Sequence, residues 1–321
     1  MFSWLAVLLL IAANPAAQKP VAPKCTDDRG AERCTAAARA KQRAIYRAPP
    51  IAQLGANGSE AIRVFYVDGY GRDVGMLVLR KPNGADPLFE FATPVRSQTL
   101  AARTDAATWM RILEAGSGFD NQPTPETRDP EEIEICLHQW MVTVEAIDSS
   151  GKVRLITQAS CDRGFAIDYA FELAKAAIPA LPICASLNSK YSRNEVTLLA
   201  ACAWLEGDKS AAAQVYNQLI PENQITEEMA LKALLSDDAV ASWRGQRTLR
   251  GPSAIASAFE DKFGKTDVYL DRLIGDSPEL ATLTFSLIDY PREDRKRTIR
   301  LRARLRKAPD GQFQITRIQA I

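Results

Sequence analysis

The sequence contains a single histidine, His138, among its 321 residues. Ser-His-Asp and Cys-His catalysis both use an imidazole to take the proton of the nucleophile, so either chemistry would depend on His138. The chain has no G-x-S-x-G motif, which is the setting of the nucleophilic serine in many hydrolases. His138 is two residues from Cys136, but a zinc site needs three or four protein ligands. We therefore predict no metal and no cofactor, and His138 is a weak catalytic candidate.

Phosphate-binding and redox motifs are also missing. Gly69-Tyr70-Gly71 has neither the G-x-G-x-x-G spacing nor the Lys-Ser/Thr ending of a phosphate-binding loop, and no C-x-x-C supports thiol exchange. The 40 basic and 39 acidic side chains leave a net charge of +1, so no overall field attracts nucleic acid or an acidic surface. Any electrostatic function must come from local clustering.

Long apolar runs are missing after the N-terminus. Residues 5–13 form an unbroken apolar run, and the small residues Ala16 and Ala17 follow it. A bilayer span needs about 20 apolar residues, whereas a shorter run before small residues is typical of a secretory signal peptide. We expect residues 1–17 to be a signal peptide cleaved near Ala17, and the protein to be periplasmic or secreted. An uncleaved membrane anchor is the alternative.

The six cysteines all follow this segment. An even number of cysteines in an exported chain favours disulfides. Because sequence alone does not choose among the connectivities, we favour pairing in sequence order, which closes short loops. Cys202 lies in an apolar helical run, so a buried free thiol is the alternative there. The predicted pairs are Cys25–Cys34, Cys136–Cys161 and Cys184–Cys202.

The order of the predicted elements indicates an α+β fold in two parts. Residues 18–49 form a tether and a surface helix held by the first disulfide, and residues 50–185 form an α+β domain with an antiparallel sheet. Residues 186–321 begin with a helix–turn–helix unit around Gly207-Asp208 that is similar to one tetratricopeptide repeat. An ordinary helical hairpin is the alternative, since such repeats need stacked neighbours. Three strands are then predicted at residues 280–288, 298–306 and 312–321.

The middle one of these strands alternates arginine with aliphatic residues. A strand places successive side chains on opposite faces, so its arginines share one face of the sheet. Residues 289–317 contain ten basic and four acidic side chains. Arginine binds carboxylates and phosphates through paired hydrogen bonds, which makes this face a candidate docking site for an acidic protein or an anionic envelope component. A solvated, solubilising face is the alternative, and nucleic acid is a poor candidate because no aromatic side chains interleave with the arginines. The arginines are Arg300, Arg302, Arg304 and Arg306.

The last third of the chain has a recognisable order of elements. A helix is followed by Asp237-Asp238-Ala239-Val240, a turn, a helix opened by Gly251-Pro252-Ser253-Ala254-Ile255, and a long antiparallel meander. This order resembles the nuclear transport factor 2-like superfamily, which includes SnoaL-like polyketide cyclases and ketosteroid isomerases, over about residues 190–321. The resemblance implies a curved sheet wrapped against helices into a cone, an apolar pocket at its open end, and homodimers formed through the outer sheet face. Residues 50–185 resemble no family.

The resemblance fails at the catalytic position. The isomerases have a general-base Asp just after the strand start, whereas Ala241, Ser242 and Trp243 stand there in this chain. We interpret Asp237 and Asp238 as the turn that ends the preceding helix. The residues expected to line the pocket are Val240, Ser242, Trp243, Ile255 and Phe259, and the weak catalytic candidates besides His138 are Glu260, Asp276 and Asp289.

These observations favour a non-catalytic, exported binding or interaction protein. It would hold a small apolar ligand in the C-terminal pocket or an anionic partner on the arginines. The first alternative is a SnoaL-like isomerase, cyclase or hydrolase that acts on a small hydrophobic substrate. The second alternative is an envelope assembly or scaffold factor.

Overall fold

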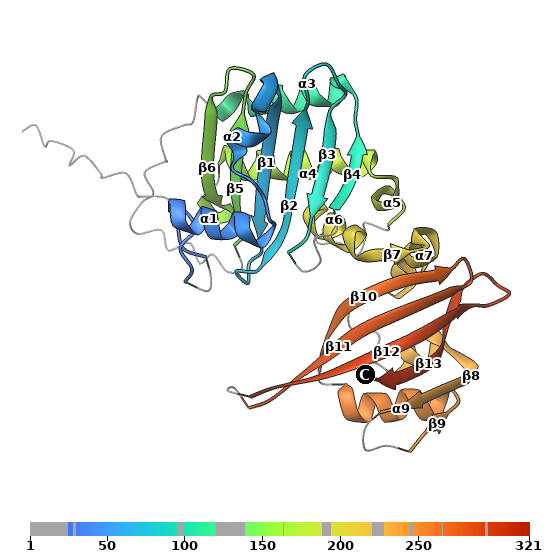
Figure 1. The fold of residues 1–321 in the computed structure, drawn as a ribbon. Helices are drawn as coiled ribbons and strands as arrows, with labels where there is room; N and C mark the ends of the chain where they lie inside the picture. Colours follow the sequence, from blue (N-terminus) through green and yellow to red (C-terminus); the bar gives the residue numbers. More distant parts are fainter. Residues whose placement is uncertain are drawn as a thin grey trace, which may run out of the picture.

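The computed structural model describes residues 25–27, 30–94, 99–119, 139–162, 164–187, 194–219, 228–243, 247–264, 266–292 and 295–321. Within these residues the protein is an α+β structure with two sheets, one from each half of the chain, and helices α4 to α7 lie between them in sequence (Figure 1). The predicted mixed α+β class is confirmed. Among the described residues, no helix has the length and hydrophobicity that a bilayer span requires.

The first sheet is antiparallel, with strand order β4-β3-β2-β1-β5-β6. Strands β1 to β4 form an antiparallel meander, of which β4 was not predicted, and the β5–β6 hairpin adds to it along β1. Asp148 closes that hairpin, because its Oδ1 accepts hydrogen bonds from the backbone N–H groups of Ser150 and Lys152. The strands are β1 (Glu60–Val67), β2 (Asp73–Lys81), β3 (Leu88–Ala92), β4 (Thr99–Arg103), β5 (Met141–Ile147) and β6 (Val153–Ala159).

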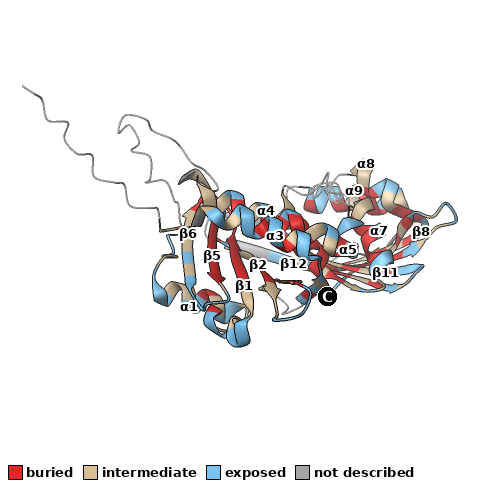
Figure 2. Cartoon of the chain, turned by 90° about the horizontal axis from the view of Figure 1, so that it is seen from above, coloured by how far each residue is buried: buried red, intermediate tan, exposed pale blue. Residues whose placement is uncertain are grey.

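The two faces of this sheet differ in chemistry. Ile62, Val64 and Tyr66 alternate along β1 on the apolar face, which α3 (Ala106–Ala115) and α4 (Phe165–Ala180) cover (Figure 2). The Tyr66 hydroxyl donates to the Ala170 carbonyl of α4 at 2.6 Å. The intervening Arg63 points to the opposite face, where the N-terminal helix lies. Period-two alternation therefore separates a hydrophobic core from a polar layer.

The N-terminal segment covers this polar layer. Helix α1 (Ala36–Ile45) begins at Thr35, whose Oγ1 accepts from the N–H of Ala38 at 3.1 Å, as expected of an N-cap residue. The disulfide Cys25–Cys34 precedes it, and both the helix and this pairing were predicted. Two short helical segments follow, α2 (Ile51–Leu54) and a 3-10 turn at Ala56–Gly58.

The middle helices connect the two sheets. The disulfide Cys184–Cys202 is present and ties α5 to α6, so the alternative of a free Cys202 is wrong. Cys161 is also disulfide-bonded, while its predicted partner, Cys136, lies outside the described residues. The helices are α5 (Pro182–Ala185), α6 (Glu195–Trp204) and α7 (Lys209–Leu219).

A short strand precedes the predicted turn at Gly207-Asp208, where Gly207 has a φ of 66° and Asp208 Oδ1 accepts from the N–H of Ala211 in α7. Strand β7 (Leu205–Gly207) pairs in parallel with β10, so these helices are joined through the second sheet and not as a plain hairpin. Glycine is required here, because a Cβ on Gly207 would lie 2.2 Å from the Gly275 carbonyl oxygen. The buried residues of both sheets and of these helices form one continuous core.

The second sheet has seven strands within the described residues, in the order β7-β10-β11-β12-β13-β8-β9. Asp237 and Asp238 lie inside β8, and the preceding helix already ends at Leu234, so the predicted helix-ending turn at these acids is wrong. Gly251 opens α9 with a φ of 80°, which glycine adopts without strain. The elements are α8 (Glu228–Leu234), β8 (Leu235–Ser242), β9 (Leu249–Arg250), α9 (Pro252–Phe263), β10 (Asp267–Ser277), β11 (Leu280–Arg292), β12 (Arg295–Lys307) and β13 (Phe313–Ala320).

Candidate functional site

The four predicted arginines lie on one face of β12, as their alternation indicates. Leu301, Ala303 and Leu305 are buried against the helices, whereas the intervening arginines lie on the other side of the sheet. Strands β11 and β13 flank β12, so this surface is the middle of the sheet and not an edge. Register adds Arg272 of β10 and Arg317 of β13 to the same side. We call the outer side chains Arg272, Arg300, Arg302, Arg304, Arg306 and Arg317 the arginine face.

The ends of the arginine face are neutralised by acids. Arg300 Nε lies 3.3 Å from Asp271 Oδ2, and Arg306 Nη2 lies 3.4 Å from Asp238 Oδ2. The Ser236 hydroxyl, together with Arg306, holds the pKa of Asp238 below its usual value. These contacts keep two of the arginines occupied by the protein itself.

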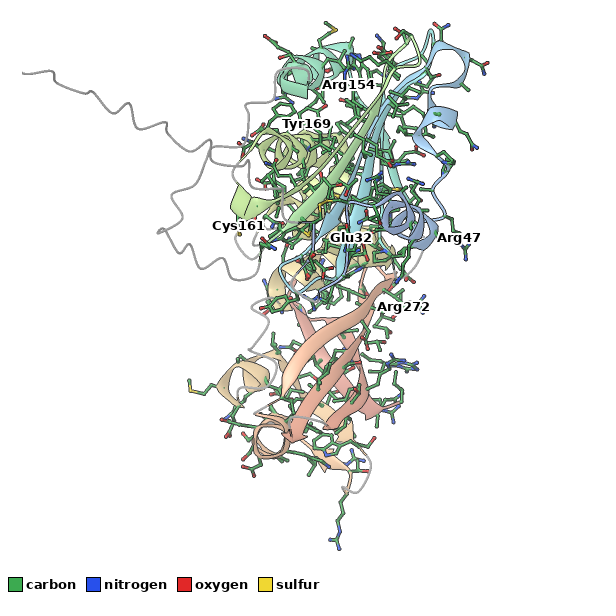
Figure 3. The ribbon with its side chains drawn as sticks, turned by 90° about the vertical axis from the view of Figure 1, so that its left-hand side faces the viewer. Glu32, Arg47, Arg154, Cys161, Tyr169 and Arg272 are labelled. Atoms are coloured by element: carbon green, nitrogen blue, oxygen red, sulfur yellow. A yellow bond between two sulfur atoms is a disulfide. The ribbon has the colours of Figure 1, made fainter. Side chains whose placement is uncertain are left out.

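Arg272 is neutralised at the margin of the same face. It lies at the end of the second sheet that is nearest the first sheet (Figure 3). Its Nε donates to Glu206 Oε2 at 2.8 Å, and its Nη2 contacts the same oxygen. Hydrogen bonding to Glu206 raises the pKa of Arg272.

The centre of the face is different. The cross-strand neighbours of Arg302 are Thr284 and Gln319, both uncharged. Arg304 stands opposite Thr282 on one side and Arg317 on the other. Within the described part of the chain, no carboxylate pairs with Arg302, Arg304 or Arg317, and we call these three residues the central trio.

A β-bulge places Arg317 in this trio. The register of β12 with β13 shifts between Arg304, which pairs with Arg317, and Leu305, which pairs with Ile315. Ile315 and Ile318 are both buried, whereas Arg317 is exposed. Strict alternation from Ile315 would turn residue 317 inward, so the extra residue in the bulge is what turns Arg317 outward. Bulges commonly redirect side chains in this way at functional sites.

The predicted apolar pocket is divided between the two faces of the sheet. Trp243 and Phe259 are buried with ring centroids 5.7 Å apart, and the Phe259 and Phe263 rings meet edge to face with centroids 4.8 Å apart. Ile255 is buried in the same core. Val240 and Ser242 do not join them, because they pair with Arg317 and Gln319 and lie on the side of the arginines. The expectation that all five residues line one pocket is therefore wrong for these two.

The predicted catalytic candidates are not gathered at this packed cluster. Glu260 is exposed on α9 and accepts from the N–H of Glu228 at 3.0 Å, and Asp276 is exposed and accepts from the Thr282 hydroxyl at 2.7 Å. The side chain of Asp289 and all of His138 lie outside the described residues. Ala241 and Trp243 are buried, and neither they nor Ser242 between them is an acid.

A small cavity lies elsewhere, between α6, α7 and β10. Trp204, Tyr216 and Leu273 are among the residues that line it, and its volume is about 10 Å³. That is about the space that one water molecule needs. The cavity is too small for the predicted ligand.

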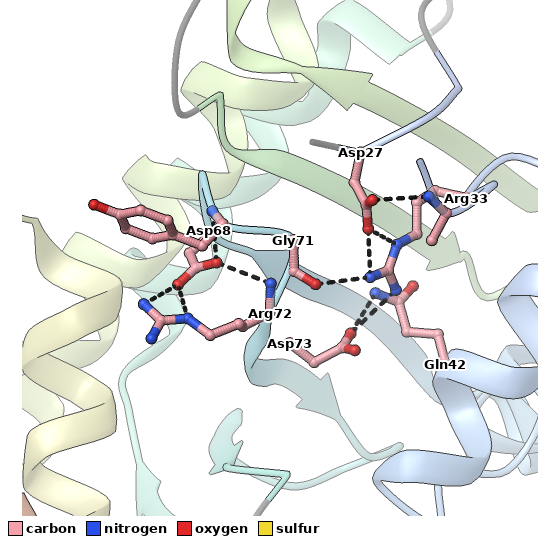
Figure 4. Close-up of polar contacts among 9 residues, drawn as sticks. Asp27, Arg33, Gln42, Asp68, Gly71, Arg72 and Asp73 are labelled. Atoms are coloured by element: carbon pink, nitrogen blue, oxygen red, sulfur yellow. Dashed lines mark hydrogen bonds and ion pairs between the residues drawn. The ribbon is translucent and has the colours of Figure 1, made fainter. Parts of the chain in front are cut away.

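A second group of charged residues anchors the N-terminal segment. Arg33 Nε donates to Asp27 Oδ2 at 2.8 Å, its Nη2 donates to the Gly71 carbonyl at 3.3 Å, and its Nη1 lies 3.5 Å from Asp73 Oδ1 (Figure 4). Gln42 of α1 also donates to Asp73 Oδ1, at 3.1 Å. These groups satisfy one another, so the cluster holds the segment to the β1–β2 turn.

Deeper in this layer, Glu145 joins two arginines. Its Oε2 accepts from Arg63 Nε at 2.8 Å, and its Oε1 accepts from Arg43 Nη1 at 3.1 Å. The side chain of Arg63 is 1% exposed, and its Nη1 donates to the Pro49 carbonyl at 2.7 Å. Burial lowers the pKa of Arg63, and Glu145 counteracts this. These groups use their hydrogen-bonding capacity on one another, which indicates a structural role.

Cys25, Glu32 and Cys34 bring three metal-binding atoms within 4.8 Å of one another. The two sulfurs are joined in a disulfide, and metal coordination needs thiolates. This group is therefore not a metal site.

No family model and no curated protein matches this chain. Solved structures that resemble it include a ketosteroid isomerase-like protein from Erwinia carotovora atroseptica, which is 18% identical over 35% of this chain and 90% of its own length, with a TM-score of 0.28. A nuclear transport factor 2-like protein with a cystatin-like fold from Novosphingobium aromaticivorans is 17% identical over 35% of this chain and 80% of its own, with a TM-score of 0.29. A de novo designed protein with a curved β-sheet is 20% identical over 30% and 86%, with a TM-score of 0.25. At these values the likenesses assign neither a family nor an activity.

Sequence reasoning missed Arg272 and Arg317 as members of the arginine face. Both lie on strands other than β12: register places Arg317 directly beside Arg304, and it places Arg272 beyond β11, in line with Thr284 and Arg302. The signal for Arg317 was the spacing of Ile315 and Ile318, which breaks the period of two and indicates a bulge.

Proposed function

We propose that this chain is a non-catalytic binding protein that docks an anionic partner on the arginine face. The observation that carries the proposal is the central trio, in which three guanidinium groups share one surface with no acid of the described chain between them. Guanidinium groups bind carboxylates and phosphates through paired, charge-assisted hydrogen bonds. Electrostatic complementarity of this kind guides the encounter and selects the partner.

Two observations support a binding role over a catalytic role. Ala241, Ser242 and Trp243, none of them an acid, stand in the neighbourhood where the resembled isomerases have their base, and Ala241 is buried. Trp243 packs against Phe259 and Phe263 with ring centroids 5.7 and 5.8 Å away. A catalytic role needs a titratable group that reaches the reacting atoms, and the described candidates Glu260 and Asp276 are exposed and bonded to neighbours.

The wider organisation belongs to the same proposal. Residues 186–321 form a nuclear transport factor 2-like domain. The observation that supports this assignment is the long sheet that packs one face against α9. Residues 50–185 form an α+β domain, whose core is continuous with that of the C-terminal half. The chain is exported, and its disulfides support this because such bonds persist in oxidising compartments.

Charge reversal on the face tests the proposal. The variant Arg302→Glu/Arg304→Glu should elute from an immobilised poly-L-glutamate column at lower salt than the wild-type protein, because it loses two of the three cations of the central trio. Ionic contacts with an exposed surface weaken as salt screens them, so the elution position reports their number.

A matched control separates this face from overall charge. Arg111→Glu/Lys175→Glu changes the net charge equally, at exposed positions of α3 and α4. We expect it to elute close to the wild-type protein. Equal shifts for the two variants, or no shift for the first, would refute docking on the arginine face.

A further inference from the structure

The bulge creates an electrostatic conflict in the free protein. Arg304 and Arg317 are directly opposed on antiparallel strands, and like charges in this position destabilise a sheet. Directly opposed residues have Cβ atoms about 4.5–5.5 Å apart. Arg302 is two residues along β12 on the same face, about 7 Å away. All three guanidinium groups can therefore reach one bound group.

Among the side chains that the structure describes, none in register relieves this conflict. The Thr282 hydroxyl on the other side of Arg304 donates to Asp276. The Thr316 hydroxyl, inside the bulge, donates to the backbone carbonyl of Arg304 at 3.2 Å. The neighbouring hydroxyls are thus engaged, and the guanidinium N–H groups of the opposed pair remain as donors.

We infer that this opposed pair is a subsite for a phosphate monoester dianion that the anionic partner carries. This inference rests on the proposed function. A carboxylate brings one negative charge to two directly opposed cations, whereas a phosphate monoester carries about −1.5 to −2 at pH 7 and has three acceptor oxygens. Each guanidinium offers a fork of N–H donors that matches two phosphate oxygens. The dianion therefore neutralises the pair, with Arg302 as a third donor.

The test uses inorganic phosphate, sulfate and acetate at constant ionic strength, with binding followed from the arginine Nε–Hε signals in NMR spectra. Because phosphate acquires its second negative charge between pH 5 and pH 8, phosphate affinity should rise several-fold over this range. Sulfate is a dianion throughout, so it reports any contribution from the protein's own acids that flank the trio, which are Asp238, Asp271 and Asp276. We expect the sulfate affinity to change much less and acetate to bind at least about tenfold more weakly than phosphate.

Single substitutions locate the subsite. Arg304→Gln and Arg317→Gln should each lower phosphate affinity by about tenfold or more, because each removes one bidentate contact, whereas Arg306→Gln, whose guanidinium is paired with Asp238, should change it little. Glycerol 3-phosphate and O-phosphoserine compare a lipid headgroup with a phosphorylated side chain. If either compound binds with an affinity similar to that of inorganic phosphate, the monoester assignment is supported. If neither compound binds, the assignment is overturned.

The outcomes separate the two proposals. Equal affinity for acetate and phosphate, a flat pH profile for phosphate, or no binding of either ion would overturn the phosphate subsite. Retention of the wild-type protein on poly-L-glutamate, lost on charge reversal, would still support docking of an anionic partner. If charge reversal instead leaves the elution from poly-L-glutamate unchanged, docking on the arginine face is itself refuted.

Discussion

Replacing Glu145 by alanine should destabilise the protein strongly. The carboxylate accepts from Arg63 through two nitrogens and from Arg43 through one, at 3.1 Å. Arg43 is 24% exposed and can turn to water, but the side chain of Arg63 is 1% exposed. Its charge would remain buried, and among the described residues its remaining partners would be the Pro49 carbonyl and the face of the Phe65 ring, 5.2 Å away. Breaking a buried ion pair by removing one partner costs about 3–5 kcal/mol, and we expect a loss of that size in the free energy of unfolding.

The measurement is urea unfolding of the oxidised protein, followed by circular dichroism. The control is Arg63→Met/Glu145→Leu, which removes both charges and keeps the volume. Because replacing both members of a buried pair by apolar groups is often neutral, this variant should be at least about 2 kcal/mol more stable than Glu145→Ala. A loss below about 1 kcal/mol for Glu145→Ala, or no recovery in the double variant, would refute the reasoning that desolvation of Arg63 dominates.

Three further predictions concern stability and titration. Arg317→Thr should raise the free energy of unfolding by about 0.2–1 kcal/mol, since it removes one of two opposed like charges; a loss in urea unfolding would contradict this. Replacing both Cys184 and Cys202 by alanine should cost about 3 kcal/mol, because the disulfide closes a loop with a sequence separation of 18, and thermal unfolding measures it. The Ser150 hydroxyl is the main cause that lowers the pKa of Asp148, so Ser150→Ala should raise it in an NMR titration of the carboxyl group. A group whose pKa is lower in the folded state than in the unfolded state stabilises the fold above the unfolded pKa, and this stabilisation is lost as pH falls through the folded pKa. Ser150→Ala should therefore make the loss of stability on acidification smaller. An unchanged Asp148 titration would exclude the hydroxyl as the cause of the lowered pKa.

The arginine face shows how far the sequence reaches. Alternation along β12 is a property of a single strand, so the shared face of Arg300 to Arg306 follows from period two alone. Which of these arginines is neutralised depends on acids contributed by β8 and β10, and these contacts arise only when the strands pair. The trio could not be found without the register.

The predicted pocket failed for a related reason. Val240 and Ser242 were grouped with Trp243 by closeness in sequence and by the family resemblance. Side chains that are neighbours or an odd number of residues apart on a strand face opposite ways, and the pairing of Val240 with Arg317 assigns it to the outer side. The short parallel pairing of β7 with β10 was missed because three residues carry no periodicity, and its requirement for Gly207 and Gly275 is visible only from the close approach of the two backbones.

The amino-acid sequence by itself determined the mixed α+β class, the β12 alternation and the start of α9 at Gly251-Pro252, and it favoured the short loops closed by Cys25–Cys34 and Cys184–Cys202. Each of these rests on local backbone preferences or on short loops, which need no knowledge of distant segments. Tertiary structure alone decided which members of the arginine face form a salt bridge with a carboxylate, because the partners come from strands far apart in the chain. It also decided that Arg317 faces outward, since a bulge forms only where the buried Ile315 and Ile318 must both reach the core.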